Sequence, residues 1–493
     1  MSTRASSGYR DSLVQQVERR LEVIPHAVER RHAMLLDGHQ QDAMLEAAIA
    51  LQSTSRHNAF SIVHSCGAGK TVLEANFVGA SQDAKNELGI NGDRKDVVLT
   101  TERALVNSIR GQFHTLGFGD DVVGIWGNGE RMLDKRIIIA TIQVIQMNRD
   151  RLGQFLPLEK IDLVIGDEAD KFLTEQRSEA VRSLNPSLRI GLTATPDWPD
   201  GRNISDLWGP IIHQMPLREG ISRGINVPPL WFLYEANIDE DSFRIRRGDY
   251  DGKTVAAAMK QAEIHRAVTD IYRTIVPANQ RHQFPTLVYV PDTAILGQVW
   301  ETLDTEFSPE GINVRGWTGT SMTPDLLRED IQAFMRGEID ILVLCEMGGR
   351  GVDFPSARLL IDAYPGLSAN KLEQRHGRVS RRVRVGSPLY NSGFRKEFSV
   401  IVQIHPHSNQ FRPLCLPDII DGWDDVIEGR PIGGPGGDGP AWLDEVDELR
   451  RRIEAQEPNF NVRRVRSLDI YRRIRRREEG LPVEDDDGFI HLP

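Results

Sequence analysis

A glycine-rich segment of the chain has the composition of a phosphate-binding loop. Residues 65–71 read SCGAGKT, and they lie between the apolar run Phe60–Val63 and a helix-forming stretch. Glycines allow the backbone to turn its N–H groups toward phosphate oxygens, and the N-terminus of the following helix is positive. Lys70 can contact the β- and γ-phosphates of ATP, and the Thr71 hydroxyl can bind Mg²⁺. The strand, loop and helix context favours this ATP site over an incidental glycine-rich turn.

Two adjacent carboxylates follow a second apolar run. Residues 161–166 (IDLVIG) have the composition of a strand and lead into Asp167 and Glu168. Ligands of open α/β sheets bind at the carboxyl ends of strands. At that end, Asp167 can bind Mg²⁺ through water, and Glu168 can orient and deprotonate an attacking water. A polar helix cap is the alternative, but together with the phosphate loop the pair predicts ATP hydrolysis.

Positioning these groups requires a sheet whose strands end together, and the chain has the pattern of one. Short β-rich runs alternate with helical stretches, which is typical of a parallel α/β sheet. The pattern pauses at residues 209–229, which contain several glycines and prolines, and a first helix is expected over residues 11–35. The expected strands are Phe60–Val63, Val97–Leu99, Val122–Ile125, Ile137–Ala140, Leu163–Ile165, Arg189–Leu192, Thr286–Val290, Ile341–Leu344, Leu359–Asp362 and Ser399–Ile404.

The composition excludes several classes of protein. With 40% hydrophobic and 27% charged residues, the chain is neither wholly disordered nor fibrous. No apolar run approaches the ~18 residues of a membrane span, and the first ten residues lack the apolar core of a secretory signal. Three isolated cysteines (Cys66, Cys345 and Cys415) make a disulfide framework or a cysteine zinc site unexpected, and a cytoplasmic location fits. The net charge of −11 excludes a uniformly basic coat, but a local basic groove is compatible with it.

Further motifs, in their order and spacing, resemble those of the superfamily 2 helicases and translocases over residues 40–381. His39-Gln40 resembles the aromatic-Gln pair that reads adenine. The other matching segments are Thr100–Val106 (TTERALV), Ala140–Gln143 (ATIQ), Thr193–Pro196 (TATP), Gly349–Asp353 (GRGVD) and Gln374–Arg381 (QRHGRVSR).

The resemblance implies an α/β fold with two tandem RecA-like parallel-sheet lobes, a short N-terminal helix and a small helical C-terminal extension. The domains expected from it are an N-terminal helical segment (1–30), a first lobe that binds ATP (31–208), a connector (209–229), a second lobe (230–405), and a linker with helical extension (406–493).

The resemblance also implies roles for single residues, with ATP and Mg²⁺ as the cofactors. The residues expected to act in catalysis are Lys70, Asp167, Glu168, Arg378 and Arg381. The residues expected to hold the metal are Thr71 and Asp167, and those expected to couple hydrolysis to movement are Thr193 and Thr195. The expected nucleotide ligands are Gln40, Ser65, Cys66, Gly67, Ala68, Gly69, Lys70, Thr71, Gly351 and Asp353.

Arginines of the second lobe are expected to complete the site. Arg378 and Arg381 lie three residues apart on an expected helix, so both can face one cleft between the lobes. An arginine supplied from across a cleft stabilises the γ-phosphate during transfer. Arg375, one turn earlier, is expected to reach the acidic motif of the first lobe. The alternative is a solvated basic helix face, since Arg382 and Arg384 follow closely.

Contacts to nucleic acid are expected mainly with the phosphate backbone, since strand tracking needs phosphate contacts more than base contacts. The candidates are Thr101, Arg103, Thr141, Gln143 and Thr318, and simple turn and cap roles are the alternative. Eight arginines lie within residues 463–477, an expected helix. This cluster is either an accessory nucleic-acid arm or a helix for a protein partner.

The tetrad at residues 167–170 reads DEAD, yet the neighbouring motifs differ from those of the DEAD-box RNA helicases. Those enzymes have Ser-Ala-Thr where this chain has TAT at residues 193–195, and Pro-Thr-Arg-Glu-Leu at the TTERAL segment. The resemblance is closer to type III restriction translocation subunits and phage or repair DNA helicases. The expected function is an ATP-dependent helicase or translocase that acts on DNA. The alternatives are a restriction or phage-defence motor that moves along duplex without unwinding, an RNA helicase, and an ATP-gated binding scaffold.

Overall fold

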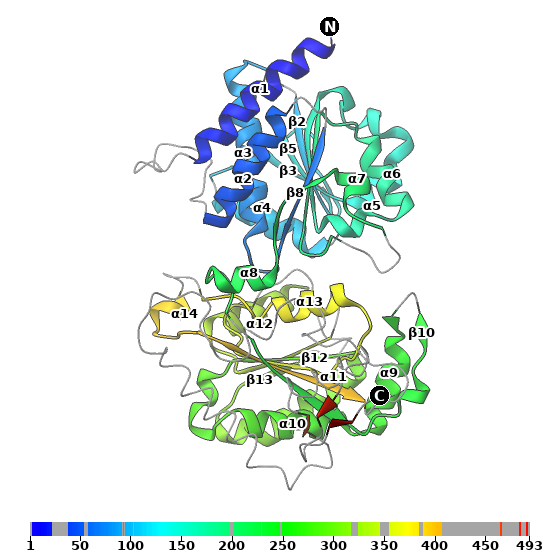
Figure 1. Cartoon of the computed structure of the whole chain (residues 1–493), viewed down its shortest axis with the longest axis vertical. Helices are drawn as coiled ribbons and strands as arrows, with labels where there is room; N and C mark the ends of the chain where they lie inside the picture. Colours follow the sequence, from blue (N-terminus) through cyan, green and yellow to red (C-terminus); the bar gives the residue numbers. More distant parts are fainter. Residues whose placement is uncertain are drawn as a thin grey trace. The chain divides into compact units, whose positions relative to one another are not determined.

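The chain forms two compact units, Met1–Pro216 and Leu217–Pro493, each with its own sheet and core (Figure 1). None of the helices that the structure describes is long and apolar enough to cross a membrane. The computed structural model describes residues 2–21, 38–53, 58–90, 92, 94–101, 103–115, 117–196, 202–227, 229–246, 249–316, 324–345, 354–383 and 388–406, and three short strands at 464–465, 483–484 and 490–491.

The first unit alternates helices and strands. Its helices are α1 (Ser2–Leu21), α2 (Gly38–Gln52), α3 (Lys70–Glu87), α4 (Arg103–Thr115), α5 (Ile142–Asn148), α6 (Glu175–Ser183) and α7 (Ser205–Trp208), and its 3-10 turns span Arg149–Gln154, Leu158–Lys160 and Ala169–Phe172. Its strands are β1 (Ala59–His64), β2 (Lys95–Thr100), β3 (Val123–Gly127), β4 (Glu130–Arg131), β5 (Ile137–Thr141), β6 (Ile161–Asp167), β7 (Leu188–Thr193) and β8 (Ile211–Met215).

These strands form a sheet in the order β4-β3-β5-β2-β6-β7-β1-β8, and every described pair is parallel except β3 with β4. Helices α1 to α4 pack on one face and α5 to α7 on the other (Figure 1). A parallel sheet covered on both faces favours continuous apolar strands, and the fully buried β5 (IIIAT) has that composition.

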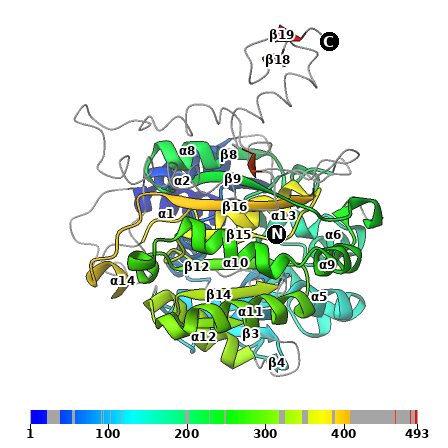
Figure 2. The same cartoon turned by 90° about the horizontal axis from the view of Figure 1, so that it is seen from below.

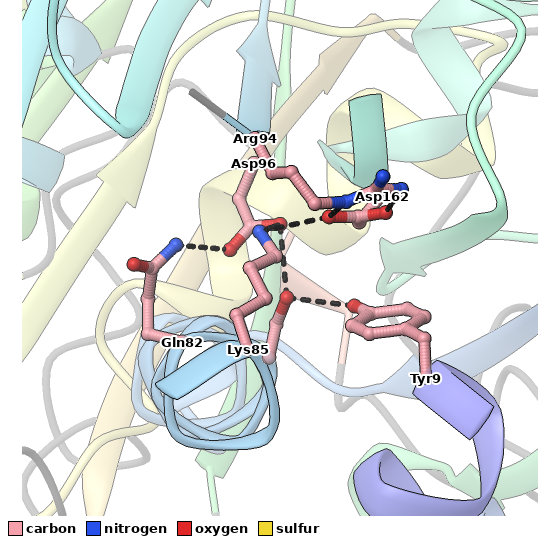
Figure 3. A network of polar contacts seen from close by, with 7 residues as sticks. Tyr9, Gln82, Lys85, Arg94, Asp96 and Asp162 are labelled. Carbon is pink, nitrogen blue, oxygen red and sulfur yellow. Dashed lines mark hydrogen bonds and ion pairs between the residues drawn. The ribbon is translucent and has the colours of Figure 1, made fainter. Parts of the chain in front are cut away.

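A buried ion network joins α1 and α3 to the amino-terminal ends of β2 and β6 (Figure 3). Lys85 Nζ lies 2.6 Å from Asp96 Oδ1 and 3.4 Å from Asp162 Oδ2, and all three side chains are fully buried. Burial raises the pKa of Asp96, and the charge of Lys85 opposes this. Ser81 also donates to Asp96 at 2.9 Å, and its hydroxyl lies 2.7 Å from that of Tyr9 on α1. The network thereby ties the N-terminal helix to the sheet.

We expect Lys85→Met to destabilise the first unit by about 3–5 kcal/mol, because two buried carboxylates would lose their shared cation. Hydrogen exchange of the β2 and β6 amides in the full chain measures this loss as faster exchange. The control is Arg149→Met, which removes one partner of the exposed Arg149–Glu179 pair and should cost at most about 1 kcal/mol. Equal exchange rates in both variants would show that the buried pairs add no stability.

The second unit also alternates helices and strands. Its helices are α8 (Leu217–Ser222), α9 (Gly252–Gln261), α10 (Ile264–Ile275), α11 (Thr293–Phe307), α12 (Pro324–Arg336), α13 (Ala369–Gly377) and α14 (Pro388–Asn391). Its strands are β9 (Pro229–Ala236), β10 (Ile245–Arg246), β11 (Asp249–Tyr250), β12 (Thr286–Val290), β13 (Val314–Gly316), β14 (Ile341–Cys345), β15 (Leu359–Asp362), β16 (Ser399–Pro406), β17 (Arg464–Val465), β18 (Val483–Glu484) and β19 (Ile490–His491).

The main sheet of this unit has the order β13-β14-β12-β15-β16-β9-β17, and all its pairs are parallel except β17 with β9. Figure 2 shows β9, β16, β15, β12 and β14 in succession, with α10 and α11 across the near face. Helices α8 and α12 pack against the other face. The expected parallel α/β fold is therefore confirmed in both units.

Three expectations about the elements need correction. The first helix, expected over 11–35, begins at Ser2, because Tyr9 extends the buried face of Leu13 and Val17 toward the N-terminus. The expected connector at 209–229 contains β8 and α8, and β8 pairs with β1. Within the C-terminal segment expected to be helical, Arg464–Val465 is a strand that pairs with β9, and the other arginines of that cluster lie outside the described residues.

Candidate active site

Three neighbouring strands of the first unit end in the motifs expected to bind and hydrolyse ATP. The phosphate loop follows β1, the TATP motif follows β7, and the acidic pair ends β6, with β7 in the middle. Val63 pairs with Thr193, and Leu192 pairs with Asp167. Because the strands are parallel, their carboxyl ends meet at one edge of the sheet. The structure therefore brings the predicted catalytic residues of the first unit together.

The phosphate loop needs its glycines for conformational reasons. Gly67 has a φ of 95° and Gly69 a φ of 72°, both in the region that favours glycine. A Cβ at Gly69 would lie 2.5 Å from Nε2 of Gln40, so the glutamine side chain would have to move away from the loop. Lys70 is the first residue of α3, as a site at a helix N-terminus requires.

Two residues at the start of α2 contact the backbone of the same loop. Gln40 Nε2 donates to the carbonyl oxygens of Ala68 (3.2 Å) and Gly69 (3.3 Å). His39 Nε2 lies 2.8 Å from the Ala68 oxygen, and both side chains are buried. The structure thus places Gln40 against the phosphate loop, and its contact with adenine stays a prediction. His39 is a loop contact that the sequence pattern did not assign, although it is adjacent to Gln40.

His64, the residue before the phosphate loop, contacts two other histidines. His64 Nε2 lies 2.9 Å from Nδ1 of His213 on β8. The His64 ring also lies 5.5 Å from that of His39, measured between centroids. The buried side chain of His64 therefore packs beneath the loop. His213 was missed by sequence reasoning because it lies in the expected connector.

Lys70 and Thr71 are partly exposed at this loop, so a phosphate can reach them. Lys70 Nζ donates to the carbonyl oxygens of His64 (3.1 Å) and Ser65 (3.5 Å). These contacts hold the ammonium group over the loop.

The acidic pair lies at the end of β6 in a constrained conformation. Glu168 has a φ of 52°, an uncommon left-handed geometry for a residue other than glycine. Its carboxylate forms an ion pair with Lys171, three residues along. Burial and, next, the charge of Glu168 raise the pKa of Asp167 to about 6. The charge of Glu168 is therefore close enough to oppose the ionisation of Asp167.

The expected coupling threonine is bonded to the acidic motif. Thr193 Oγ1 donates to Asp170 Oδ1 at 2.5 Å and accepts from the Thr195 N–H at 3.1 Å. Trp208 on α7 donates to the Ala169 carbonyl at 3.1 Å. The acidic motif and the TATP motif therefore form one hydrogen-bonded unit. Trp208, fully buried, is a supporting residue that no sequence motif indicated.

The candidate nucleic-acid contacts of the first unit lie in two segments that the structure brings together. Gln143 Nε2 donates to the Thr101 carbonyl at 2.9 Å, which joins the two candidate loops. Thr101 and Thr141 are 6% and 1% exposed, so both side chains are buried in this structure, and their contacts with nucleic acid stay a prediction. Arg103 begins α4, and neither its side chain nor Thr318 lies within the described residues.

The arginine motif of the second unit is built around a buried carboxylate. Arg375 Nε donates to Asp362 Oδ2 at 3.1 Å, and His376 Nε2 lies 2.9 Å from the same oxygen. Burial by itself would raise the pKa of Asp362. The charge of Arg375 is the largest of the interactions that outweigh burial and lower this pKa. The expectation that Arg375 reaches the acidic motif of the first lobe therefore needs correction, since Asp362 within the second unit binds its guanidinium group.

Arg378 and Arg381 do not lie on one helix as expected. Helix α13 ends at Gly377, and Arg378 Nε donates to the Gln374 carbonyl at 3.1 Å. Arg381 forms an isolated antiparallel bridge with Asn226. The helix stops because the chain turns to pair with this segment, where the Val227 N–H donates to the Ser380 carbonyl at 2.6 Å. Gly351 and Asp353 lie outside the described residues.

Comparison with known families agrees with this arrangement. The sequence model described as "Type III restriction enzyme, res subunit" matches residues 33–198, and "Helicase conserved C-terminal domain" matches residues 265–383. The chain belongs to the superfamily 2 helicases and translocases. Its two units are accordingly tandem RecA-like lobes.

Curated relatives and solved structures of this superfamily resemble the chain at low identity. The "Putative ATP-dependent helicase IRC3" of Saccharomyces cerevisiae is 24% identical over 77% of this chain and 53% of its own length. The "DNA 3'-5' helicase XPB" of Mycobacterium tuberculosis is 26% identical over 65% of this chain and 54% of its own length. The chain thus spans about half the length of these relatives.

Many solved structures share the fold, among them a restriction enzyme subunit and an RNA-bound protein. The fragment of a putative HsdR subunit of a type I restriction enzyme from Vibrio vulnificus has a TM-score of 0.54 at 18% identity, over 82% of this chain and 68% of that one. Dbp5 of S. cerevisiae, bound to RNA and ADP BeF3, has a TM-score of 0.52 at 14% identity, over 88% and 99%.

The phosphate site of this helicase-family chain has the oxygen ligands that Mg²⁺ prefers. The Thr71 hydroxyl and the Asp167 carboxylate would hold the ion. The fully buried carboxyl group of Glu74 lies near Asp167 and receives no hydrogen bond from a donor among the described residues, so it offers the site further carboxyl oxygens. When bound, the ion neutralises charge on the β- and γ-phosphates.

We expect Lys70→Ala to weaken ATP binding by about 10- to 100-fold, because hydrogen bonds to charged groups contribute roughly 1.5–3 kcal/mol. Fluorescence titration with a labelled ATP analogue measures this affinity. Lys260→Ala, on α9 of the second unit, serves as the control. Unchanged affinity in Lys70→Ala would contradict the assignment of the phosphate loop.

Proposed function

We propose that this protein is an ATP-dependent DNA helicase or translocase, which couples ATP hydrolysis to movement along a strand. The observation that carries the proposal is the convergence of the phosphate loop, the acidic pair and Thr193 at one edge of the first sheet. ATP binding, hydrolysis and coupling groups are thereby close enough to act together.

In the proposed reaction, Lys70 and the loop N–H groups bind the phosphates of ATP. Glu168 accepts a proton from the attacking water, and Arg378 stabilises the charge that develops on the γ-phosphate. The Thr193–Asp170 hydrogen bond connects the acidic motif to the TATP motif. Changes at the nucleotide can therefore pass to the neighbouring strand end.

Two findings support DNA as the nucleic acid. The sequence model that matches the first lobe is named for a restriction enzyme subunit, and one relative is named a DNA 3'-5' helicase. An RNA helicase is the alternative, and the resemblance of the fold to an RNA-bound structure does not decide between them.

A second candidate function is a restriction or phage-defence motor that translocates duplex DNA without unwinding it. The match of residues 33–198 to the restriction subunit model favours this candidate. A catalytically weak, ATP-gated scaffold is a third candidate. The presence of Lys70, Asp167 and Glu168 at one sheet edge speaks against it.

Two substrates separate these functions. One is a DNA duplex with a single-stranded tail, and the other is a blunt duplex that carries a third strand as a triplex. A helicase releases the labelled strand of the first when ATP is added, whereas a duplex motor releases only the third strand of the second. ATP-dependent DNA binding with no strand release from either substrate would indicate the scaffold and contradict the proposal. Glu168→Gln is the matched inactive control for both substrates.

A further inference from the structure

Glu74 is a buried acid to which neither the motifs nor the proposed reaction assigns a role. It lies on α3, one helical turn after Lys70, and its side chain is 0% exposed. Neither carboxyl oxygen has a hydrogen-bond partner among the described residues. A buried carboxyl group without a donor needs either a proton or a nearby cation to offset its charge.

The neighbours of Glu74 are the groups of the nucleotide site. Its carboxyl group lies against that of Asp167, with Lys70 as the nearby cation and Glu168 as a further acid. Glu74, Asp167 and Glu168 thus form a cluster of three acids beside the phosphate loop, with Lys70 and Lys171 as the nearby cations.

A packing role does not require a carboxylate at this position. Leu73 and Phe77 on the same helix are buried and contribute to the apolar core of the first unit. An apolar residue at position 74 would avoid the desolvation of an acid. A divalent cation beside Asp167, by contrast, would supply the missing positive charge, and carboxylate oxygens orient the ligands and waters of such ions.

We propose that Glu74 is a positioning residue for the divalent cation of the nucleotide site, where its carboxylate orients Asp167 and the water molecules bound to the ion. This inference rests on the proposed ATP-dependent function and adds a third protein group to the expected pair Thr71 and Asp167. It predicts that Glu74 sets how much Mg²⁺ the protein needs to bind nucleotide.

The test measures nucleotide binding without turnover. The protein (residues 1–493) is mixed with fluorescent, non-hydrolysable mant-AMPPNP and titrated with MgCl₂. The nucleotide affinity is then measured again in EDTA. For Glu74→Gln, the half-saturating Mg²⁺ concentration should rise by about 10- to 100-fold, the cost typical of losing a group that supports a metal ligand. Affinity in EDTA should stay unchanged, which also shows that the variant is folded. Glu74→Asp, which keeps the charge, should shift the Mg²⁺ requirement less.

The matched control is Glu87→Gln. Glu87 lies at the other end of α3 from the phosphate loop, and its carboxylate accepts hydrogen bonds from Ser12 and Gln16. It should show the Mg²⁺ requirement of the wild type. A Glu74→Gln variant with that same requirement would overturn this inference and leave the proposed function intact. Wild-type protein that bound no mant-AMPPNP at any Mg²⁺ concentration would overturn the proposed function and this inference with it.

Discussion

Replacing Glu168 by glutamine should lower the rate of ATP hydrolysis by about 10²- to 10⁴-fold while ATP still binds. The amide has the size of the carboxylate but accepts no proton from the attacking water. Glu168 follows β6 directly and forms an ion pair with Lys171. Because glutamine has nearly the same size as glutamate, the substitution removes the charge without leaving a cavity. Single-turnover hydrolysis and a binding titration with the same nucleotide separate the two effects.

The control for this variant is Glu179→Gln on α6, which makes the same chemical change at an exposed acid of the same unit. Hydrolysis by that variant should equal the wild-type rate. If Glu168→Gln hydrolysed ATP at a normal rate, another group would have to activate the water. If it lost ATP binding, Glu168 would act in binding rather than in proton transfer.

Replacing Arg378 by alanine should reduce kcat by about 10³-fold or more, with only a modest loss of ATP affinity. The phosphate loop and Lys70 lie in the first unit, so they bind ATP without this arginine. An interaction made only in the transition state changes kcat even at saturating ATP. Steady-state hydrolysis measured against ATP concentration, with and without DNA, gives both constants.

The matched control is Arg273→Ala on α10, an exposed arginine of the second unit that pairs with Asp270 and Glu306. Its kinetics should equal those of the wild type. An Arg378→Ala variant that kept kcat and raised only KM would place this arginine outside the transition state. Stabilisation of the transition state would then be a role of Arg381 or of neither arginine.

Local sequence patterns were sufficient where the structure depends on local interactions. The expected strands Thr286–Val290 and Leu359–Asp362 coincide with β12 and β15, because buried parallel strands are short apolar runs bounded by polar residues. The phosphate loop was equally clear, because Gly67 and Gly69 adopt positive φ angles that few other residues tolerate.

Features that depend on distant parts of the chain could not be predicted in this way. Strand β8 is only partly buried, so it lacks a continuous apolar run, and its place beside β1 is set by long-range pairing. The motif around Thr141 suggests a contact with phosphate, but the exposure of its side chain depends on its neighbours in the fold, which bury it. Arg375 likewise finds its partner, Asp362, thirteen residues earlier at the end of a buried strand.

The central claim is that nucleic acid stimulates ATP hydrolysis at the site that contains Lys70 and Glu168. The direct test is steady-state ATP turnover in four parallel reactions with no nucleic acid, single-stranded DNA, duplex DNA and single-stranded RNA. We predict slow turnover without nucleic acid, a clear increase with DNA that exceeds any increase with RNA, and no increase with the Glu168→Gln variant. Turnover that stayed the same in all four reactions, although the protein bound ATP, would contradict the proposed function.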